Sequence, residues 1–357
     1  MSSPKAYRVI QWATGEIGRI ALRHFIENPA FELVGVWVAS PDKCGKDAGE
    51  LAKSTVKTNI LATNDVDALL ALDADCIHYS AFSMGSGADE LDLFSRMLRS
   101  GKNVISTVGP YYHYGLYKTQ FEQLDKVCKE SGKSFHGSGV HPGFAGDLLP
   151  ITLLRAASRV DHIHLYEVVD FLATPNHYIG YMGFGLDPVE LLKNPKRDKN
   201  AHVIFAQSMQ MLADALGVGE IERFETFHEV SKAKTDLVYQ GGEVKKGMVG
   251  GQHWTWTAVC DGRPLISYHS YWIMGEELEP KWDCGKGGYK IVIEGEPKLD
   301  LELKGLARNG VLGYPAYNLG ATMGVNVVHA VVDAAPGVLT HWDLGVVKPK
   351  GLMREVL

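Results

Sequence analysis

Small residues follow the first apolar stretch of the chain at a spacing that could hold a phosphate group. Residues 7–12 read as a β-strand, and Ala13-x-Gly15-x-x-Gly18 comes directly after them. In a dinucleotide-binding fingerprint, small residues at this spacing let the backbone turn tightly and let a pyrophosphate approach the N-terminus of the next helix. Ala13 stands where the fingerprint has its first glycine. The competing interpretation is a turn whose small residues serve only helix–sheet packing.

The residues expected to contact a dinucleotide come from this turn and from the ends of later strands. They are Ala13, Thr14, Gly15, Glu16, Ile17, Gly18, Ser40, Lys43, Ser80 and Thr107. A carboxylate at the end of the second strand would bind ribose hydroxyls and repel a 2′-phosphate, whereas Ser40 and Lys43 offer a hydroxyl and a positive charge. We therefore expect NADP(H) to be the preferred cofactor. NAD(H) is the alternative, because Asp42 lies in the same short loop.

Tyrosine and histidine residues follow two further predicted strand ends. Tyr111, Tyr112 and His113 come after the strand that ends at Thr107, and His141 lies in a glycine-rich turn after the next strand. Hydride transfer from a nicotinamide needs an oriented substrate, a dry pocket and a proton donor, and tyrosine or histidine can donate that proton. We predict catalytic roles for Tyr112, His113 and His141, and a substrate contact for Tyr111. The alternative is an aromatic loop and a turn histidine with structural roles only.

Glu167 is a further catalytic candidate, on the strand-like run that also holds Tyr166 and Asp170. Its carboxylate could orient a base or bind an amine. We predict that Tyr166 and Asp170 contact the substrate. A salt bridge or a solvated strand face explains these residues equally well. The nearby pair His162-x-His164 could place two imidazoles on one face, but no third ligand is signalled, so we expect no metal site.

The elements that must position these residues begin with a βαβ unit over residues 7–40. Strand-like and helical stretches then alternate up to residue 146, which is typical of a Rossmann doubly wound parallel sheet whose ligands bind beyond the carboxyl ends of the strands. We expect a dinucleotide-binding Rossmann domain over 1–146 and a substrate and dimerisation domain over 147–310. A C-terminal segment, 311–357, carries a helical pattern at 321–334 that should return to the Rossmann domain.

The second domain is expected to be α+β and built on an open, largely antiparallel sheet. Period-two runs replace the helical patterns, Asp261-Gly262 is a hairpin signal, and residues 298–304 alternate strictly between apolar and charged. Tryptophan and tyrosine are frequent over residues 254–282. Because an open sheet rich in aromatic residues has edges and a face that a single subunit would leave wet, we predict a homodimer.

Composition excludes several classes of protein. The chain has 357 residues, enough for two cores, and a net charge of −6, which gives no basic surface for nucleic acid. No apolar run is long enough to span a membrane, and the N-terminus has no secretory leader pattern. The five cysteines are scattered without a paired motif and are expected to be reduced thiols. We therefore expect a cytoplasmic protein that acts on a small molecule.

With these motifs in view, the chain resembles proteins that have a dihydrodipicolinate-reductase-type N-terminal domain. The resemblance rests on the opening fingerprint, the 137–144 turn, Met182-Gly183-Phe184-Gly185 and Ala334-Ala335-Pro336-Gly337-Val338. Within these proteins, the chain is most similar in its motifs to the branch of 2,4-diaminopentanoate dehydrogenases and related amine dehydrogenases. It implies an NAD(P)H-binding Rossmann domain, an α+β second domain, a homodimer, and substrate contacts from His177, Tyr178 and Phe184.

One departure from that branch bears on the reaction. Its amine dehydrogenases carry a glutamate after the strand that ends here at Thr107, where it binds the amine nitrogen, whereas residues 108–113 contain no carboxylate. His141 also stands where asparagine is expected. The sequence therefore predicts an oxidoreductase that transfers hydride to a carbonyl or imine carbon, with carbonyl reduction exceeding reductive amination. The alternatives are an amine dehydrogenase, a cofactor-binding sensor without catalysis and an S-adenosylmethionine enzyme. Enzymes of the last class usually have a carboxylate at the end of the second strand to bind the ribose, and Ala39-Ser40 offers none.

Overall fold

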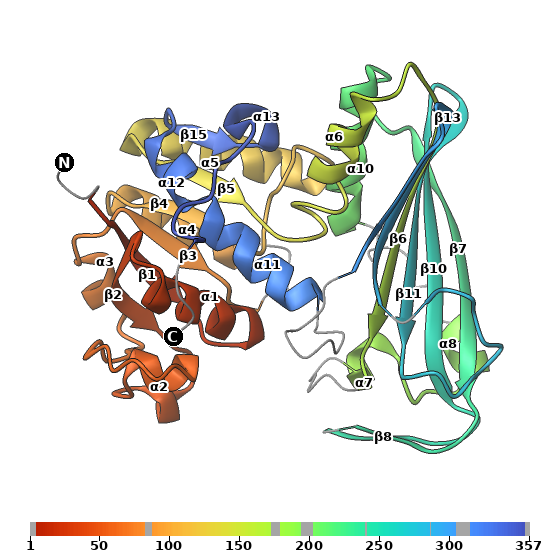
Figure 1. Ribbon diagram of the computed structural model, residues 1–357, viewed down its shortest axis with the longest axis horizontal. Helices are drawn as coiled ribbons and strands as arrows, with labels where there is room; N and C mark the ends of the chain where they lie inside the picture. Colours follow the sequence, from red (N-terminus) through yellow and green to blue (C-terminus); the bar gives the residue numbers. More distant parts are fainter. Residues whose placement is uncertain are drawn as a thin grey trace. The chain divides into compact units, whose positions relative to one another are not determined.

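The computed structural model describes seven stretches of the chain, which divide between two compact units. The stretches are 5–82, 88–172, 179–193, 203–239, 241–285, 287–304 and 315–353. One unit comprises Met1–Phe144 and Tyr317–Leu357, and the other comprises Ala145–Ala316. Figure 1 shows the elements of both. No helix of the described stretches is both long enough and apolar enough to cross a membrane.

The first unit is built on a six-stranded parallel sheet. Its strands are β1 (Tyr7–Trp12), β2 (Phe31–Trp37), β3 (Cys76–Tyr79), β4 (Asn103–Ser106), β5 (Ser134–Gly137) and β15 (Gly337–Leu339). Their order is β15-β5-β4-β3-β1-β2, and every neighbouring pair is parallel. The predicted doubly wound sheet is confirmed. The order reverses at β1, and ligands of such sheets bind in the crevice beyond the carboxyl ends of the strands at this point.

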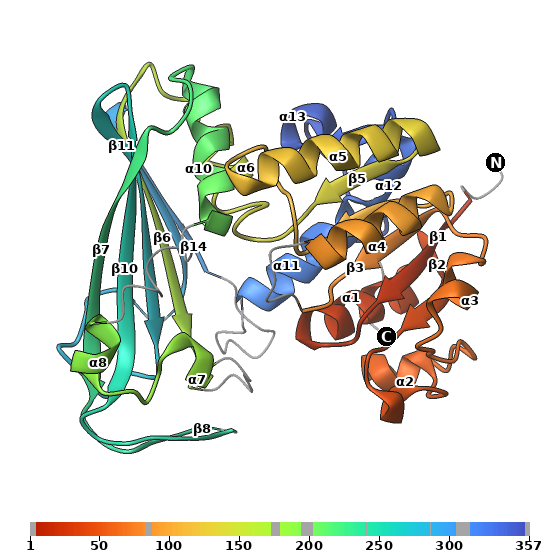
Figure 2. The same cartoon turned by 180° about the vertical axis from the view of Figure 1, so that it is seen from behind.

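Helices cover both faces of this sheet, as Figures 1 and 2 show from opposite sides. They are α1 (Glu16–Glu27), α2 (Ala48–Ala52), α3 (Val66–Leu70), α4 (Ala88–Arg99), α5 (Leu116–Ser131), α11 (Pro315–Asn326), α12 (Val328–Asp333) and α13 (His341–Leu344), with the 3₁₀ turn η1 (Pro41–Lys43). Helices α1, α11 and α12 share one core, and α3, α4 and α5 share the other. Strands β3, β4 and β5 are buried at every residue because both faces are covered.

The C-terminal part of the chain completes this unit. Helices α11 and α12 pack on the face that α1 covers, and β15 then pairs in parallel with β5. The sequence pattern predicts one helix over 321–334, but the structure has two, which divide at Val327. Val325, Val327 and Val328 place three β-branched side chains at this point, and such side chains weaken a continuous helix.

The second unit is built on a seven-stranded mixed sheet in the order β12-β7-β10-β11-β6-β13-β14. These strands are β6 (Arg159–Asp170), β7 (Arg223–Ala233), β10 (Val249–Cys260), β11 (Arg263–Ile273), β12 (Leu278–Glu279), β13 (Gly288–Glu296) and β14 (Leu299–Leu303). Only the β6–β11 pair is parallel, so the predicted, largely antiparallel sheet is confirmed. Asp261 and Gly262, with φ of 49° and 71°, form the expected hairpin turn between β10 and β11.

Smaller elements complete the second unit. They are the hairpin β8 (Leu237–Tyr239) and β9 (Gly242–Val244), with the helices α6 (Leu148–Leu154), α7 (Ile179–Met182), α8 (Pro188–Leu192) and α10 (Val203–Leu216). Phe205 of α10 packs on the rings of Trp256 and Tyr268, with centroids 5.6 and 4.6 Å apart. Helix α10 therefore contributes to covering one face of the large sheet.

Strand β6 shows that the two faces of this sheet differ. Ile163, Leu165 and Glu167 are buried on one face, whereas His162, His164 and Tyr166 alternate with them and are partly exposed. We call these the Glu167 face and the histidine face. The strand register adds Tyr268, Ser270, Trp272, Trp254, Trp256 and Tyr289 to the Glu167 face, and His269, Tyr271, Ser267, His253 and Thr255 to the histidine face.

Candidate active site

The turn after β1 has the strained backbone that a dinucleotide-binding turn needs. Ala13 has a φ of 75°, in the left-handed region that favours glycine. Two contacts hold it there: its N–H donates to the Trp37 carbonyl at 3.0 Å, and its carbonyl accepts from Gln11 Nε2 at 2.9 Å. Gln11 Nε2 also donates to Ser80 Oγ at 2.8 Å. The turn is thereby tied to the ends of β2 and β3.

Gly15 and Gly18 serve different purposes in this turn. A Cβ atom at Gly18 would lie 2.2 Å from the Ala13 carbonyl oxygen and 2.7 Å from Ser80 Oγ, so the close approach of α1 to the sheet requires glycine. A Cβ atom at Gly15 would meet nothing within 4 Å. Gly15 is the exposed N-cap residue of α1, with no side chain capping the helix. The open space beside Gly15 fits the expected place of a pyrophosphate.

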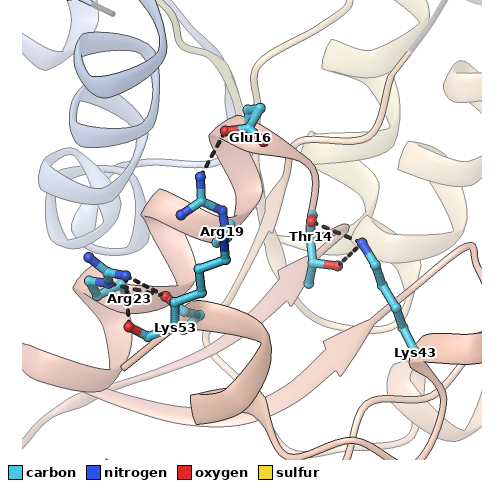
Figure 3. A network of polar contacts seen from close by, with 7 residues as sticks. Thr14, Glu16, Arg19, Arg23, Lys43 and Lys53 are labelled. Carbon is cyan, nitrogen blue, oxygen red and sulfur yellow. Dashed lines mark hydrogen bonds and ion pairs between the residues drawn. The ribbon is translucent and has the colours of Figure 1, made fainter. Parts of the chain in front are cut away.

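Lys43 brings a positive charge to the same turn, as Figure 3 shows. Its Nζ donates to Thr14 Oγ1 at 3.2 Å and to the Thr14 carbonyl at 3.3 Å. Ser40 and Asp42 are exposed beside it, at the end of β2. Glu16 points away into an ion pair with Arg19 at 2.8 Å. The structure therefore gathers Thr14 and Lys43, two of the residues predicted to contact cofactor, at one point.

Two polar residues that sequence reasoning missed support the turn from below. His78 is fully buried in β3, and its Nδ1 lies 3.0 Å from Gln11 Oε1. Burial lowers the pKa of His78 to about 4, so the ring is neutral at pH 7 and Nδ1 carries the proton that it donates to Gln11. A Cβ atom at Gly324 of α11 would lie 2.4 Å from His78 Nε2. The sequence does carry a signal for this pair, because Gln11 and His78 are polar residues inside otherwise apolar strands.

Tyr111 joins the two strand-end loops that follow β4 and β5. Its hydroxyl donates to the Thr107 carbonyl at 2.5 Å, and only 7% of the residue is exposed. A Cβ atom at Gly137 would lie 2.9 Å from Tyr111 Cα, and one at Gly139 would lie 3.7 Å from the Tyr111 hydroxyl. The ring therefore fills the space between the loops, and its predicted contact with substrate stays a prediction.

The three other candidates of these loops differ in exposure. Tyr112 is buried, with its ring centroid 4.1 Å from that of the exposed His113, which also packs on Phe121 at 5.8 Å. His141 is half-buried and joined to Pro142 by a cis peptide bond. All three follow the carboxyl ends of β4 and β5, where a proton donor would be needed. Their catalytic roles stay predictions.

Glu167 lies deep in the second unit. It is 8% exposed, and Trp272 Nε1 donates to its Oε1 at 3.3 Å. Burial raises the pKa of Glu167, and the polar side chains of Trp272, Tyr268, Tyr289 and Ser270 oppose that rise. Burial and the nearby Glu167 charge in turn hold the pKa values of Tyr268 and Tyr289 well above their ordinary range. The region is buried and rich in polar side chains, and perturbed pKa values of this kind are frequent at functional sites.

The other residues predicted to contact substrate occupy separate places. Tyr166 lies on the histidine face, its ring 4.5 Å from that of His269. Asp170 Oδ1 accepts from the backbone N–H groups of Leu172 and Gly275, each at 2.9 Å, and Phe184 lies in a hydrophobic core. The remaining two predicted contacts, His177 and Tyr178, lie outside the described residues. The structure therefore separates Tyr166 from Glu167 rather than bringing them together.

The histidine pair that could have begun a metal site has other contacts. The rings of His162 and His164 stack 4.2 Å apart, and His162 Nε2 bonds Ser267 Oγ at 2.8 Å while His164 Nδ1 bonds His269 Nε2 at 3.2 Å. Over the part of the chain that the structure describes, no three histidine, cysteine, aspartate or glutamate side chains gather closely enough to hold a metal ion.

Comparisons with known proteins match this architecture along the whole chain. An amine dehydrogenase of Streptomyces virginiae is 28% identical over 347 residues, which cover 94% of this chain and 95% of that protein. A 2,4-diaminopentanoate dehydrogenase of Acetoanaerobium sticklandii is 26% identical over 235 residues, covering 66% of this chain and 63% of that protein. The solved structure of an amine dehydrogenase from Mycobacterium smegmatis has a TM-score of 0.80 at 17% identity, over 98% of each chain.

A family model identifies the second half of the chain. The model of the 2,4-diaminopentanoate dehydrogenase C-terminal domain matches residues 144–356, more than half of the sequence. The resemblance inferred from the sequence motifs is confirmed. So is the expectation of an enzyme that uses a nicotinamide cofactor. The chain therefore belongs to the 2,4-diaminopentanoate dehydrogenase C-terminal domain family, and it is an NAD(P)-dependent oxidoreductase.

Proposed function

We propose that the protein is an NAD(P)H-dependent amine dehydrogenase, which joins ammonia to the carbonyl carbon of a small organic molecule and reduces the resulting imine. The observation that carries the proposal is the similarity to the Streptomyces virginiae amine dehydrogenase over 94% of this chain. The fingerprint turn supports it, because Gly15 leaves space for a pyrophosphate and Gly18 lets α1 approach the sheet. The bound nicotinamide would supply the hydride, and the protein would hold the carbon and nitrogen groups in place.

A ketone panel tests this proposal. Purified protein with NADPH is mixed with ketones and aldehydes at pH 9, with and without excess ammonium chloride, and NADPH oxidation and amine product are both measured. We expect oxidation that depends on ammonium and yields amine. NADPH oxidation at the same rate with sodium chloride, giving alcohol, would contradict the proposal.

Carbonyl reduction is the second candidate, and one observation favours it. The loop after β4, residues 108–113, holds no carboxylate, while Tyr112 is buried there. A tyrosine hydroxyl can donate a proton to a carbonyl oxygen, so this loop suits alcohol formation better than amine binding. The same assay separates the two candidates by product. A cofactor-binding sensor would bind NADPH without turnover of any ketone.

We also propose that NADP(H) is preferred over NAD(H). Lys43 places a positive charge 3.2 Å from Thr14 Oγ1, and the exposed Ser40 supplies a hydroxyl at the end of β2. Both suit the 2′-phosphate of NADP(H). Asp42 is exposed in the same turn and would suit a ribose hydroxyl. Equal affinity for NADH and NADPH in a fluorescence titration would contradict this preference.

We propose further that two copies pair through the histidine face. Its half-buried rings include His162, His269 and Tyr271, and burial lowers the pKa values of the two histidines to about 4 and about 3, so the face is uncharged at these positions at pH 7. Neutral aromatic surface of this kind is common in obligate interfaces. Light scattering should give a dimer at micromolar concentration, and His269→Glu should give monomer. A wild-type monomer would contradict the proposal.

Cysteine chemistry supports the proposed cytoplasmic location. All five cysteines are free thiols. Burial raises the pKa values of Cys76 and Cys128, which keeps both thiols protonated and unreactive at pH 7. Free thiols persist in a reducing compartment. Fractionation of the host cell with an antibody against the protein tests the location.

A further inference from the structure

Gln11 is a fully buried polar residue in a strand whose other buried positions are apolar. It is 0% exposed in β1, between Ile10 and Trp12. Strands covered by helices on both faces are normally lined with apolar side chains, so a buried amide needs a partner for each of its polar atoms. The hydrogen-bond partners of Gln11 lie at the carboxyl ends of β1 and β3 and are Trp12, Ala13, His78 and Ser80.

These partners fix the direction in which the Gln11 amide points. Gln11 Nε2 lies 2.9 Å from the Ala13 carbonyl oxygen and 3.2 Å from the Trp12 carbonyl oxygen. Because carbonyl oxygens can only accept hydrogen bonds, the NH₂ group of the amide must face them. Gln11 Oε1 then faces His78 Nδ1 at 3.0 Å and accepts a hydrogen bond from it. The donor side of the Gln11 amide is therefore directed at the fingerprint turn.

Hydrogen bonds hold both peptide groups that flank the Ala13 Cα atom. In the preceding peptide, the Ala13 N–H donates to the Trp37 carbonyl at 3.0 Å. The Trp12 carbonyl of that peptide accepts from the Ser80 N–H at 3.0 Å. In the following peptide, the Ala13 carbonyl accepts from Gln11 Nε2. Because fixing two consecutive peptide planes fixes the dihedral angles between them, these contacts hold Ala13 at its φ of 75°, which glycine adopts without help.

The oxygens that Gln11 binds are also those against which α1 packs. A Cβ atom at Gly18 would lie 2.2 Å from the Ala13 carbonyl oxygen and 2.7 Å from Ser80 Oγ. Gln11 Nε2 donates to both of these oxygens, at 2.9 and 2.8 Å. Gln11 therefore sets the surface that determines how closely the first turn of α1 approaches the sheet. The backbone N–H groups of that first turn are the donors that a bound pyrophosphate would use.

We infer that Gln11 is a positioning residue for the nicotinamide cofactor, because its amide holds Ala13 in the conformation that the first glycine supplies in the usual fingerprint. Since Gln11 is fully buried, it acts through Ala13 and α1 rather than by touching the cofactor. The inference deepens the proposed function and rests on it for the use of a nicotinamide cofactor. It does not depend on whether the product is an amine or an alcohol.

Asn103 shows what a purely structural amide of the same sheet looks like. It is 4% exposed at the start of β4. Its Nδ2 donates to the Asp75 carbonyl and its Oδ1 accepts from the Ser134 N–H, each at 2.9 Å. These bonds tie the amino ends of β3, β4 and β5, at the opposite end of the strands from the fingerprint turn. Asn103→Leu is therefore the matched control, because it removes a buried amide of the sheet without touching the turn.

The first test is a cycle of variants at positions 11 and 13, measured by NADPH fluorescence titration. Gln11→Met keeps the length of the side chain and removes the amide, so we expect NADPH to bind about tenfold more weakly. In the Ala13→Gly background the same substitution should weaken binding by at most about twofold, because glycine adopts the turn conformation unaided. An equal loss in both backgrounds would overturn the inference. Melting temperatures report whether each variant is folded, and Gln11→Asn, whose amide is one methylene shorter, takes the place of Gln11→Met in the cycle if the latter does not fold.

The second test distinguishes cofactor positioning from a structural role. NADH and NADPH share the pyrophosphate, so Gln11→Met should weaken the binding of both by the same factor. Asn103→Leu should lower the melting temperature and leave both dissociation constants unchanged. If Gln11→Met also melts at a lower temperature but binds both cofactors as wild type does, its role is structural and the inference fails.

The same measurements separate this inference from the proposed function. Wild-type protein that binds neither NADH nor NADPH would overturn both together. Wild-type protein that binds both cofactors and turns over no ketone would contradict the proposed function alone, because the cycle at positions 11 and 13 is read from binding and not from turnover.

Discussion

Tyr166 and Glu167 are neighbours in the sequence and lie on opposite faces of β6. Tyr166 stacks on His269 among the half-buried rings of the histidine face. Glu167 accepts a hydrogen bond from Trp272 on the buried Glu167 face. Because side chains alternate along a strand, one pocket on one face cannot use both. The predicted substrate residues of this strand therefore belong to two different faces of the sheet.

Valine at the two glycines of the fingerprint should have different consequences. Gly15→Val meets nothing in the protein, so we expect loss of NADPH binding with an unchanged melting temperature. Gly18→Val collides with the Ala13 carbonyl, so we expect it to lose binding and also to melt at a lower temperature. Fluorescence titration and calorimetry measure the two effects. Wild-type affinity in Gly15→Val would mean that the space beside α1 does not hold the cofactor.

Removing the positive charge beside the fingerprint should reduce the preference for NADPH. Lys43→Gln leaves Thr14 in place and deletes the ammonium group, so we expect NADPH to bind about tenfold more weakly, which is about 1.4 kcal/mol. NADH affinity should change little. Lys57→Gln, an exposed lysine of the same unit, is the control. If the two variants bind NADPH equally well, Lys43 does not contact the 2′-phosphate.

Glycine at position 13 should stabilise the first unit. Ala13 has a φ of 75°, a conformation that costs an L-residue about 1–2 kcal/mol and glycine almost nothing. The extra freedom of glycine in the unfolded chain offsets part of that gain. We therefore expect Ala13→Gly to raise the free energy of unfolding by about 0.5–1 kcal/mol. Denaturation at pH 7 measures it, and a loss of stability would mean that the Ala13 methyl group makes a favourable contact.

Acid should destabilise the protein partly through His78. The pKa of this buried ring is lowered from 6.5 to about 4, so as the pH falls through that window the unfolded chain binds a proton that the folded chain does not. The free energy of unfolding should therefore fall by about 3 kcal/mol from this residue between pH 6.5 and pH 4. His78→Gln stays neutral and can still bond Gln11. Denaturation at pH 7 and pH 4.5 should show a smaller loss in the variant than in wild type.

Local patterns predicted much of the fold. The strand, fingerprint and helix at the start of the chain, and the Asp261-Gly262 turn, each depend on residues within a few positions of one another. The pairing of β15 with β5 does not, because the strand has three residues and its partner lies about 200 positions earlier in the chain. Contacts over such a separation leave no local signature.

The candidate site was less predictable for a similar reason. Strand periodicity places Tyr166 and Glu167 on opposite faces, but only the assembled sheet shows which face is buried. The same holds for Gln11 and His78, whose hydrogen bond joins neighbouring strands and supports the fingerprint turn from positions 67 residues apart. The absence of a carboxylate from residues 108–113, after Thr107, could be read from the sequence. The burial of the Glu167 carboxylate in the other unit could not be read from it.

The division of the chain also fixes the order in which the protein can be completed during synthesis. The second unit is inserted between Phe144 and Tyr317 of the first. A nascent chain that has left the ribosome only up to residue 314 lacks α11, α12 and β15, so β5 is an unpaired edge and the α1 side of the sheet exposes Ile105 and Cys76. The inserted sheet can fold before the cofactor-binding sheet is finished. We expect chains truncated at residue 314 to be captured by chaperones and to bind no NADPH.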